Sequence, residues 1–312
     1  MKPYQRICNL AVAAILGILI GGILSTAKAR TARAQADAGA NAWNQPVEPF
    51  RIIGDIYYVG ATDLTSYLIV TRAGDILLDG GLVETAPQVE ANIRKLGFRL
   101  GDVKILLSSH AHYDHAGGLA ELKRATRAKF YASAGDAPAL ENGGRGDASL
   151  LDPTAFPPIK PDAILHDGEK ISLGGATMTA HLTPGHTKGC TTWTTTVEDG
   201  GKPYQVVFVC STSVLPGIPL IHNSAYPNIA TDYERTFRVL RSLPCDVFLG
   251  AHGVFFDLTD KRKALQQGAK TNPFIDPAGY RTYVDRSEAA FQQDLHDQEA
   301  KAKSQTKGSG EN

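Results

Sequence analysis

The chain of 312 residues has few of the features that define several common protein classes. It holds only four cysteines and no Cys-x-x-Cys pair, which excludes the usual structural zinc motifs. Its 32 basic residues are balanced by 32 acidic ones, and no long basic run is present, so we predict no nucleic-acid partner. Its main apolar stretch, residues 10–24, is short of the roughly 20 residues that cross a bilayer.

The N-terminus has the three-part pattern of a secretory signal peptide. Lys2 and Arg6 precede the apolar stretch, which leads into small residues. Ala27-Lys28-Ala29 and Ala34-Gln35-Ala36 both fit the cleavage pattern, so we expect cleavage between residues 29 and 36. A retained membrane anchor is the alternative, but the short apolar stretch favours cleavage. We therefore predict a periplasmic or secreted protein with no stable membrane association.

The mature chain is expected to form one domain. Residues 1–36 carry five basic and no acidic residues, so their removal leaves 27 basic against 32 acidic residues, a net charge of −5. The remaining 276 residues suit a single large core, which we place at residues 37–303 in a monomer. The polar segment 304–312 is predicted to be a disordered tail.

Strands and helices are predicted to alternate along this domain. Short apolar runs bounded by turn residues predict strands at 56–59, 66–70, 75–79, 104–109, 130–133, 170–182, 191–197, 205–210 and 246–249. Helical spacing and capping signals predict helices at 84–96, 118–126, 261–270 and 286–303, and one that starts at Thr231. Segments 134–162 and 211–230 are expected to be long loops. The order predicts an α/β fold with two similar halves.

Residues 110–115 read His-Ala-His-Tyr-Asp-His and supply four candidate metal ligands: His110, His112, Asp114 and His115. They follow the apolar run 104–109, so they lie where a buried strand ends, and α/β proteins build many of their sites there. Imidazole nitrogens with a carboxylate oxygen suit zinc. The alternative, a polar loop with fortuitous histidines, fits poorly with three of nine histidines in six residues.

Two further histidines occupy similar positions. His186 lies in the turn Thr-Pro-Gly-His-Thr after a predicted strand, and His252 lies just past the predicted strand 246–249. With the first cluster they give six ligands, which could hold two metals with three ligands each. Structural zinc sites are closed by four protein ligands whereas catalytic ones keep an open position, so the number favours catalysis.

The three cysteines outside the signal segment predict one disulfide. Cys190 and Cys210 lie at the edges of the predicted strands 191–197 and 205–210, so pairing across neighbouring strands is reasonable, and an exported protein can keep a disulfide. Cys245 is then left unpaired.

Four motifs together resemble the metallo-β-lactamase superfamily: the His-x-His-x-Asp-His run, the Asp79-Gly80 strand end, the Thr-Pro-Gly-His-Thr turn and the late Gly-Ala-His. The resemblance covers residues 50–260 and implies a four-layer αβ/βα sandwich with the metals at one edge, between the halves. Within the superfamily the chain is most similar to class B β-lactamases of subclass B3. Other subclasses have a cysteine ligand where this chain has His115.

The resemblance implies two Zn²⁺ per chain and a small-molecule β-lactam substrate. His110, His112 and His186 would bind the first zinc, and Asp114, His115 and His252 the second. Asp114 would also act catalytically by orienting a metal-bound hydroxide that attacks the lactam carbonyl, so the enzyme would confer antibiotic resistance. Ser211 and Ser213 would contact the substrate carboxylate, although their loop carries one extra residue before its proline. Asp79, at a strand end, would either support a ligating histidine or be a simple turn residue.

Two rival functions fit parts of the same pattern. A thioesterase of the glyoxalase II type or a lactonase shares the metal site, but those enzymes typically have a bridging aspartate where this chain has Cys210-Ser211, and they are usually cytoplasmic. An exported zinc-binding or carbohydrate-binding module without chemistry would leave the open metal positions idle. The missing aspartate and the predicted export both count against the thioesterase or lactonase, and the open metal positions count against a module without chemistry.

Overall fold

The computed structural model describes residues 42–147, 149–150 and 154–308, so the predicted signal peptide lies outside the described residues. Contacts divide the chain into two units, Met1–Gln45 and Pro46–Asn312. Every element below belongs to the second unit. Within the described ranges, no helix combines the length and apolarity needed to cross a membrane.

Seven strands in sequence order form the first sheet. They are β1 (Phe50–Ile53), β2 (Ile56–Tyr58), β3 (Tyr67–Ile69), β4 (Asp75–Leu78), β5 (Val103–Leu107), β6 (Lys129–Ser133) and β7 (Ala163–Leu165). Strands β1 to β4 pair antiparallel, and β4 to β7 pair parallel. The parallel strands carry their carboxyl ends to one edge of the sheet.

Five strands form the second sheet in the order β12-β11-β10-β9-β8. They are β8 (Lys170–Leu173), β9 (Ala176–Leu182), β10 (Thr191–Asp199), β11 (Lys202–Val209) and β12 (Val247–Gly250). The only parallel pair in this sheet is β11 with β12. The ends of β9, β11 and β12 precede His186, Ser211 and His252, respectively.

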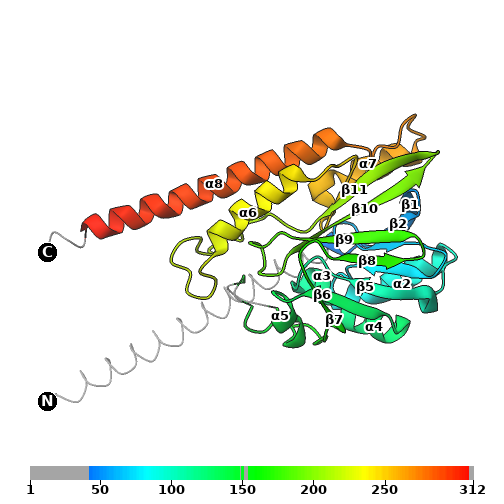
Figure 1. Cartoon of the computed structure of the whole chain (residues 1–312), viewed down its shortest axis with the longest axis horizontal. Coiled ribbons are helices and arrows are strands. Elements are labelled where there is room, and N and C mark those ends of the chain that lie inside the picture. The colour runs from blue at the N-terminus through cyan, green and yellow to red at the C-terminus, as the bar shows by residue number, and fades with distance from the viewer. Residues whose placement is uncertain (1–41, 148, 151–153, 309–312) are drawn as a thin grey trace, which may run out of the picture. The chain divides into compact units, whose positions relative to one another are not determined.

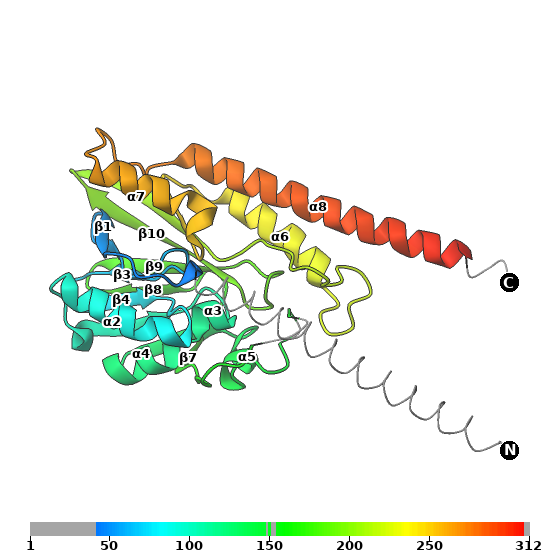
Figure 2. The same cartoon turned by 180° about the vertical axis from the view of Figure 1, so that it is seen from behind.

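Helices cover the outer faces of both sheets (Figures 1 and 2). They are η1 (Val83–Thr85), α2 (Ala86–Lys95), η2 (Leu100–Asp102), α3 (Tyr113–Ala116), α4 (Leu119–Thr126), α5 (Ala137–Glu141), α6 (Ile229–Ser242), η3 (Gly253–Phe256), α7 (Leu258–Gln266) and α8 (Pro277–Gly308). The predicted α/β architecture with two sheets in a layered αβ/βα sandwich is therefore confirmed.

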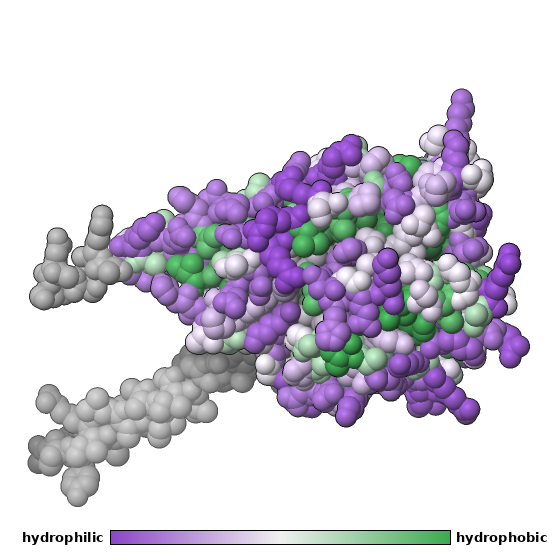
Figure 3. Space-filling model, viewed as in Figure 1, coloured by the Kyte–Doolittle hydropathy of each residue, from purple (hydrophilic) through white to green (hydrophobic). Residues whose placement is uncertain are grey.

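The alternation of side chains along the strands explains the layers. On β5, Leu106 packs into the cluster that contains Val89 of α2 and Leu122 of α4, whereas Leu107 packs into the cluster that also contains Trp193 of the second sheet. Successive strand residues point to opposite faces, so one strand supplies both layers. Hydrophilic residues cover most of the face drawn in Figure 3, and hydrophobic residues form small separate patches there.

Several predicted elements differ from the structure. The predicted loop 134–162 contains the short helix α5, and β7, directly after that loop, was not predicted. The predicted strand 170–182 is the hairpin of β8 and β9, which turns at Gly174 and Gly175, both with positive φ. Helix α6 starts at Ile229, two residues before the predicted start, and α7 lies about three residues earlier than predicted.

The last helix is the largest correction. Helix α8 starts at Pro277 instead of residue 286, and it extends to Gly308. Residues 304–308 belong to this helix, while 309–312 lie outside the described residues. Proline suits the first turn of a helix, and lysine, glutamine and alanine extend an existing helix well although they bury little surface.

Replacing Trp193 on β10 tests how much the core between the sheets stabilises the fold. Trp193 is fully buried, and its Nε1 donates to the Ser108 carbonyl at the end of β5 at 3.1 Å. Replacing Trp193 with alanine should lower the free energy of unfolding by about 3–5 kcal/mol, because it leaves a cavity. Chemical denaturation measures the loss. Glu198→Ala, at an exposed position of the same strand, is the control, and an equal loss in both variants would contradict the assignment.

Candidate metal centre

The six predicted ligands meet at the edge where the strands of both sheets end. His110 and His112 follow β5, Asp114 and His115 lie in the single turn of α3, His186 follows β9, and His252 follows β12. All are buried except His252, which is half-buried. The chain thus brings together residues that are up to 142 positions apart in the sequence.

Three imidazoles form the first cluster. The ligand atoms of His110, His112 and His186 lie within 4.8 Å of one another. Nε2 of His110 is buried and makes no hydrogen bond in the described part of the chain. A buried polar nitrogen without a partner is costly unless another group binds it. Three converging imidazole nitrogens, one of them unpaired, fit a divalent transition metal.

Asp114, His115 and His252 form the second cluster. Nε2 of His115 lies 3.1 Å from Nε2 of His252, and Oδ2 of Asp114 lies 3.4 Å and 3.5 Å from these two nitrogens. The rings of His110 and His115 are 4.3 Å apart between centroids, so the two clusters adjoin. The set of two imidazoles and a carboxylate also fits a divalent metal.

Burial and charge set the protonation of these groups. Burial lowers the pKa of His110 and His112 well below the usual value and that of His186 to about 4, so their nitrogens are free to bind a metal. Burial would raise the pKa of Asp114, but His115 and His252 outweigh it, so this carboxyl is ionised. Burial would lower the pKa of His252, but Asp114 and Asp63 outweigh it and raise it to about 9.

Hydrogen bonds behind the histidines select which nitrogen faces the cluster. Nδ1 of His186 donates to the Ser213 carbonyl at 2.8 Å, and Nδ1 of His252 donates to Oδ2 of Asp63 at 2.9 Å. In both residues Nε2 is therefore the nitrogen that could bind a metal. His112 is reversed, because its Nε2 lies 2.8 Å from Oγ of Ser149, so Nδ1 is the free nitrogen. Such outer contacts fix the tautomer and orientation of ligating histidines.

Asp136 is a supporting residue that the sequence did not single out. Its buried carboxylate accepts hydrogen bonds from the Ala111 amide at 2.9 Å, the Gly189 amide at 2.8 Å and the Thr187 hydroxyl at 3.0 Å. Ala111 lies between His110 and His112, and Thr187 is next to His186. One carboxylate therefore joins the two loops of the first cluster. Asp63, which orients His252, was also missed.

Asp79 supports the strand end. It is 1% exposed and has a positive φ, and its Oδ1 accepts the Ser109 amide at 2.6 Å. Its Oδ2 lies 3.9 Å from Nδ1 of His115, which is too long for a hydrogen bond. Burial raises the pKa of Asp79 to about 6. The structure thus places Asp79 beside His115, and its role as that residue's partner stays a prediction.

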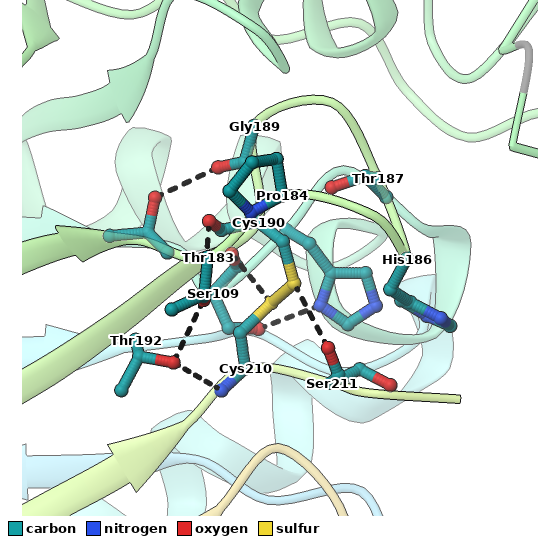
Figure 4. The surroundings of a disulfide bond; sticks show 12 residues. Ser109, Thr183, Pro184, His186, Thr187, Gly189, Cys190, Thr192, Cys210 and Ser211 are labelled. Carbon is teal, nitrogen blue, oxygen red and sulfur yellow. Dashed lines mark hydrogen bonds between the residues drawn. A yellow bond between two sulfur atoms is a disulfide. The ribbon is translucent and has the colours of Figure 1, made fainter. Parts of the chain in front are cut away.

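The predicted disulfide between Cys190 and Cys210 is confirmed, and Cys245 is free, as expected. Figure 4 shows the disulfide beside the His186 turn and directly before Ser211. Sγ of Cys210 lies 3.3 Å from the Ser109 carbonyl. The disulfide therefore fixes the start of the loop that carries Ser211 and Ser213.

The two serines differ in exposure. Ser211 is 3% exposed, and its hydroxyl accepts the Ser213 amide at 3.3 Å, whereas the Ser213 side chain is exposed. Their predicted contact with a substrate carboxylate stays a prediction.

A family model described as the metallo-β-lactamase superfamily matches residues 59–252. The native FEZ-1 metallo-β-lactamase from Legionella gormanii is 46% identical, with 82% of this chain and 98% of that chain covered and a TM-score of 0.80. BJP-1, a subclass B3 metallo-β-lactamase of Bradyrhizobium japonicum, is 38% identical, with 83% and 98% covered and a TM-score of 0.77.

Matches to curated proteins are shorter. A hydroxyacylglutathione hydrolase from Rhodospirillum rubrum is 31% identical over 138 residues, which is 43% of this chain and 44% of that enzyme. The other curated hydroxyacylglutathione hydrolases are matched over 27% to 41% of their length. The chain thus spans less than half the length of the curated relatives it matches.

Replacing Asp136 with asparagine tests its support of the ligand loops. An amide has one acceptor oxygen, so it cannot satisfy donors at both oxygens of the carboxylate. We expect zinc affinity to fall about 10- to 100-fold, as for other outer contacts of metal sites. Competition with a chromogenic chelator measures it. Asp199→Asn, which removes a surface ion pair with Arg51, should leave the affinity unchanged; an equal loss there would count against a specific role.

The raised pKa of His252 predicts a pH effect on metal binding. With a pKa of about 9 the metal-free His252 is protonated at neutral pH, and a metal bound at Nε2 must displace that proton. Zinc binding at pH 7 should therefore release about one proton, and affinity should rise as the pH approaches the pKa. Calorimetry in buffers with different protonation enthalpies counts the protons. A binding enthalpy independent of the buffer would contradict this.

Proposed function

Because the chain belongs to the metallo-β-lactamase superfamily, we propose that it is a zinc-dependent β-lactamase that hydrolyses the lactam amide bond of antibiotics and so confers resistance to them. The observation that carries the proposal is the pair of adjoining ligand clusters at the edge between the sheets. The solved structures named above, similar over nearly their whole length, support it.

Six residues would hold two Zn²⁺. His110, His112 and His186 would bind one ion, and Asp114, His115 and His252 the other. Zinc, when bound, would polarise the lactam carbonyl and provide a nucleophile at neutral pH by lowering the pKa of water. With three protein ligands each, both ions would keep an open position for water and substrate.

The chain's own residues would orient the reaction. The ionised carboxylate of Asp114 would accept a hydrogen bond from the attacking water and orient it toward the substrate. The hydroxyls of Ser211 and Ser213 would donate to the substrate carboxylate. The Ser213 side chain is exposed, and the Ser211 hydroxyl also accepts the Ser213 amide. The chemistry would need no covalent intermediate, because the nucleophile is water.

A thioesterase or lactonase of the same fold is the second candidate, because the curated hydroxyacylglutathione hydrolases match part of the chain. The structure gives one reason against it. The resemblance described above places the bridging aspartate of such enzymes where this chain has Cys210-Ser211, and the Cys210 sulfur is committed to the disulfide. No carboxylate from that position would bridge two metals.

Export from the cytoplasm fits the same proposal. A disulfide beside the site needs an oxidising compartment to form and persist. A signal peptide at residues 1–36, a domain over 37–303 and a periplasmic or secreted monomer are parts of the proposal. Edman sequencing or mass spectrometry of the exported chain would identify its first residue.

Hydrolysis of β-lactams by the purified mature protein is the direct test. A chromogenic cephalosporin and a carbapenem should both be hydrolysed, and a zinc chelator should abolish turnover because it removes the metals. Zinc added back should restore activity. If a protein shown to hold two zinc ions hydrolysed neither substrate but cleaved a thioester or lactone, the second candidate would replace the first.

His186→Ala tests the ligand assignment. Loss of one imidazole from the first cluster should lower kcat/KM at least about 100-fold, because that metal would be bound weakly or in the wrong geometry. His296→Ala, on the exposed surface of α8, is the matched control and should leave kcat/KM unchanged. Normal hydrolysis by a zinc-replete His186→Ala protein would refute the assignment.

A further inference from the structure

The segment between β11 and α6, residues 210–228, runs along helices α6 and α8. Figures 1 and 2 show it beside α6 and reaching toward the outer part of α8. It carries Ser211 and Ser213, which the proposed function assigns to the substrate carboxylate. Outside the turn Leu215–Ile218, whose ends are joined by the Ile218 amide and the Leu215 carbonyl, its first part has little backbone pairing of its own. What holds this segment therefore determines where the two serines lie.

The near end of the segment is attached through two tyrosines. The hydroxyl of Tyr283 in α8 lies 2.9 Å from Oγ1 of Thr212, between the two serines. The hydroxyl of Tyr233 in α6 donates to the Ser213 carbonyl at 2.7 Å, and the ring of Phe291 in α8 stacks on Tyr233 at 5.1 Å. The same Ser213 carbonyl accepts from Nδ1 of His186.

The far end is attached through one side chain. Nε2 of Gln298 in α8 donates to the Ile218 carbonyl at 3.1 Å, and its Oε1 accepts the Leu220 amide at 2.7 Å. Ile218 and Leu220 are 5% and 3% exposed. A primary amide can donate to a carbonyl and accept from a backbone amide at the same time.

The three residues of α8 that take part in these contacts share one face of the helix. Tyr283, Phe291 and Gln298 are spaced eight and seven residues apart, close to two turns each. Residues 283 and 298 are therefore about 22 Å apart along the axis. Eight residues from Thr212 to Leu220 reach at most about 26–29 Å when fully extended, and the turn at 215–218 shortens that reach. The segment has little slack between its two attachments.

We propose that α8 sets the position of the substrate-contacting serines, and that Gln298 is the positioning residue that holds the far end of their segment. The proposal rests on the proposed function for its substrate. Gln298 would act through the backbone of residues 213–220 and would not touch the substrate. Its loss would free the segment at one end, so binding would weaken while the metal centre stayed intact.

Two substitutions of Gln298 separate its two hydrogen bonds. Gln298→Ala removes both, and Gln298→Glu keeps the acceptor for the Leu220 amide but places a carboxylate against the Ile218 carbonyl. We expect KM for a chromogenic cephalosporin to rise about fivefold in the glutamate variant and about tenfold in the alanine variant, with kcat within about twofold, because uniform binding is lost and the chemistry is not. Zinc content should stay at the wild-type level.

Gln293→Ala is the matched control. Gln293 lies on the same helix, is exposed, and bonds only its helix neighbour Asp297 at 2.8 Å among the contacts described. Its KM should equal that of the wild type. An unchanged KM in both Gln298 variants would overturn the proposal, and so would a fall in kcat and thermal midpoint without a change in KM, which indicates a merely structural role.

Backbone amide exchange separates this proposal from the proposed function. In Gln298→Ala the amides of residues 213–220 should exchange at least about tenfold faster than in the wild type and in Gln293→Ala. If the wild-type protein hydrolysed no β-lactam, the function would fail, and faster exchange would still support the attachment by Gln298. Unchanged exchange would overturn it whatever the activity.

Discussion

Six candidate metal ligands, five of them buried, gather at the edge where the strands of both sheets end, and this gathering is the constraint on which the rest of the structure depends. Removing imidazoles and a carboxylate from water is costly, and the unpaired Nε2 of His110 shows that the protein alone does not offset the cost. A divalent cation would offset it. The surrounding hydrogen bonds, including those of Asp63 and Asp136, would then hold the ligands in place while that cation binds.

The second half of the chain is held around this centre first by a disulfide and then by hydrogen bonds. The disulfide between Cys190 and Cys210 joins two strands next to the His186 turn. Beyond it, the segment with Ser211 and Ser213 depends on hydroxyl and amide groups of α6 and α8. The Ser213 carbonyl links this segment to the metal centre, because it also accepts the hydrogen bond from Nδ1 of His186.

The sequence predicts what is local and misses what is not. The ligands at 110–115 crowd into six residues, and the strands before them are continuous apolar runs, so both could be read directly. Asp63 and Asp136 are isolated aspartates whose farthest partners lie 191 and 53 residues away, and nothing near them in the sequence signals this. Helix α8 extends nine residues further toward its N-terminus than predicted, because its buried Tyr280 and Val284 depend on packing against the body.

The second ligand cluster joins His115 to His252, 137 residues later, with a contact at 3.1 Å. A cation bound there would be a cross-link between the two halves, made only after both have folded and docked. It would stabilise the docked state by mass action, in proportion to the logarithm of the free zinc concentration. The lifetime of the folded chain would then depend on the zinc concentration around it, and a low zinc concentration would remove the protein through proteolysis as well as through loss of activity.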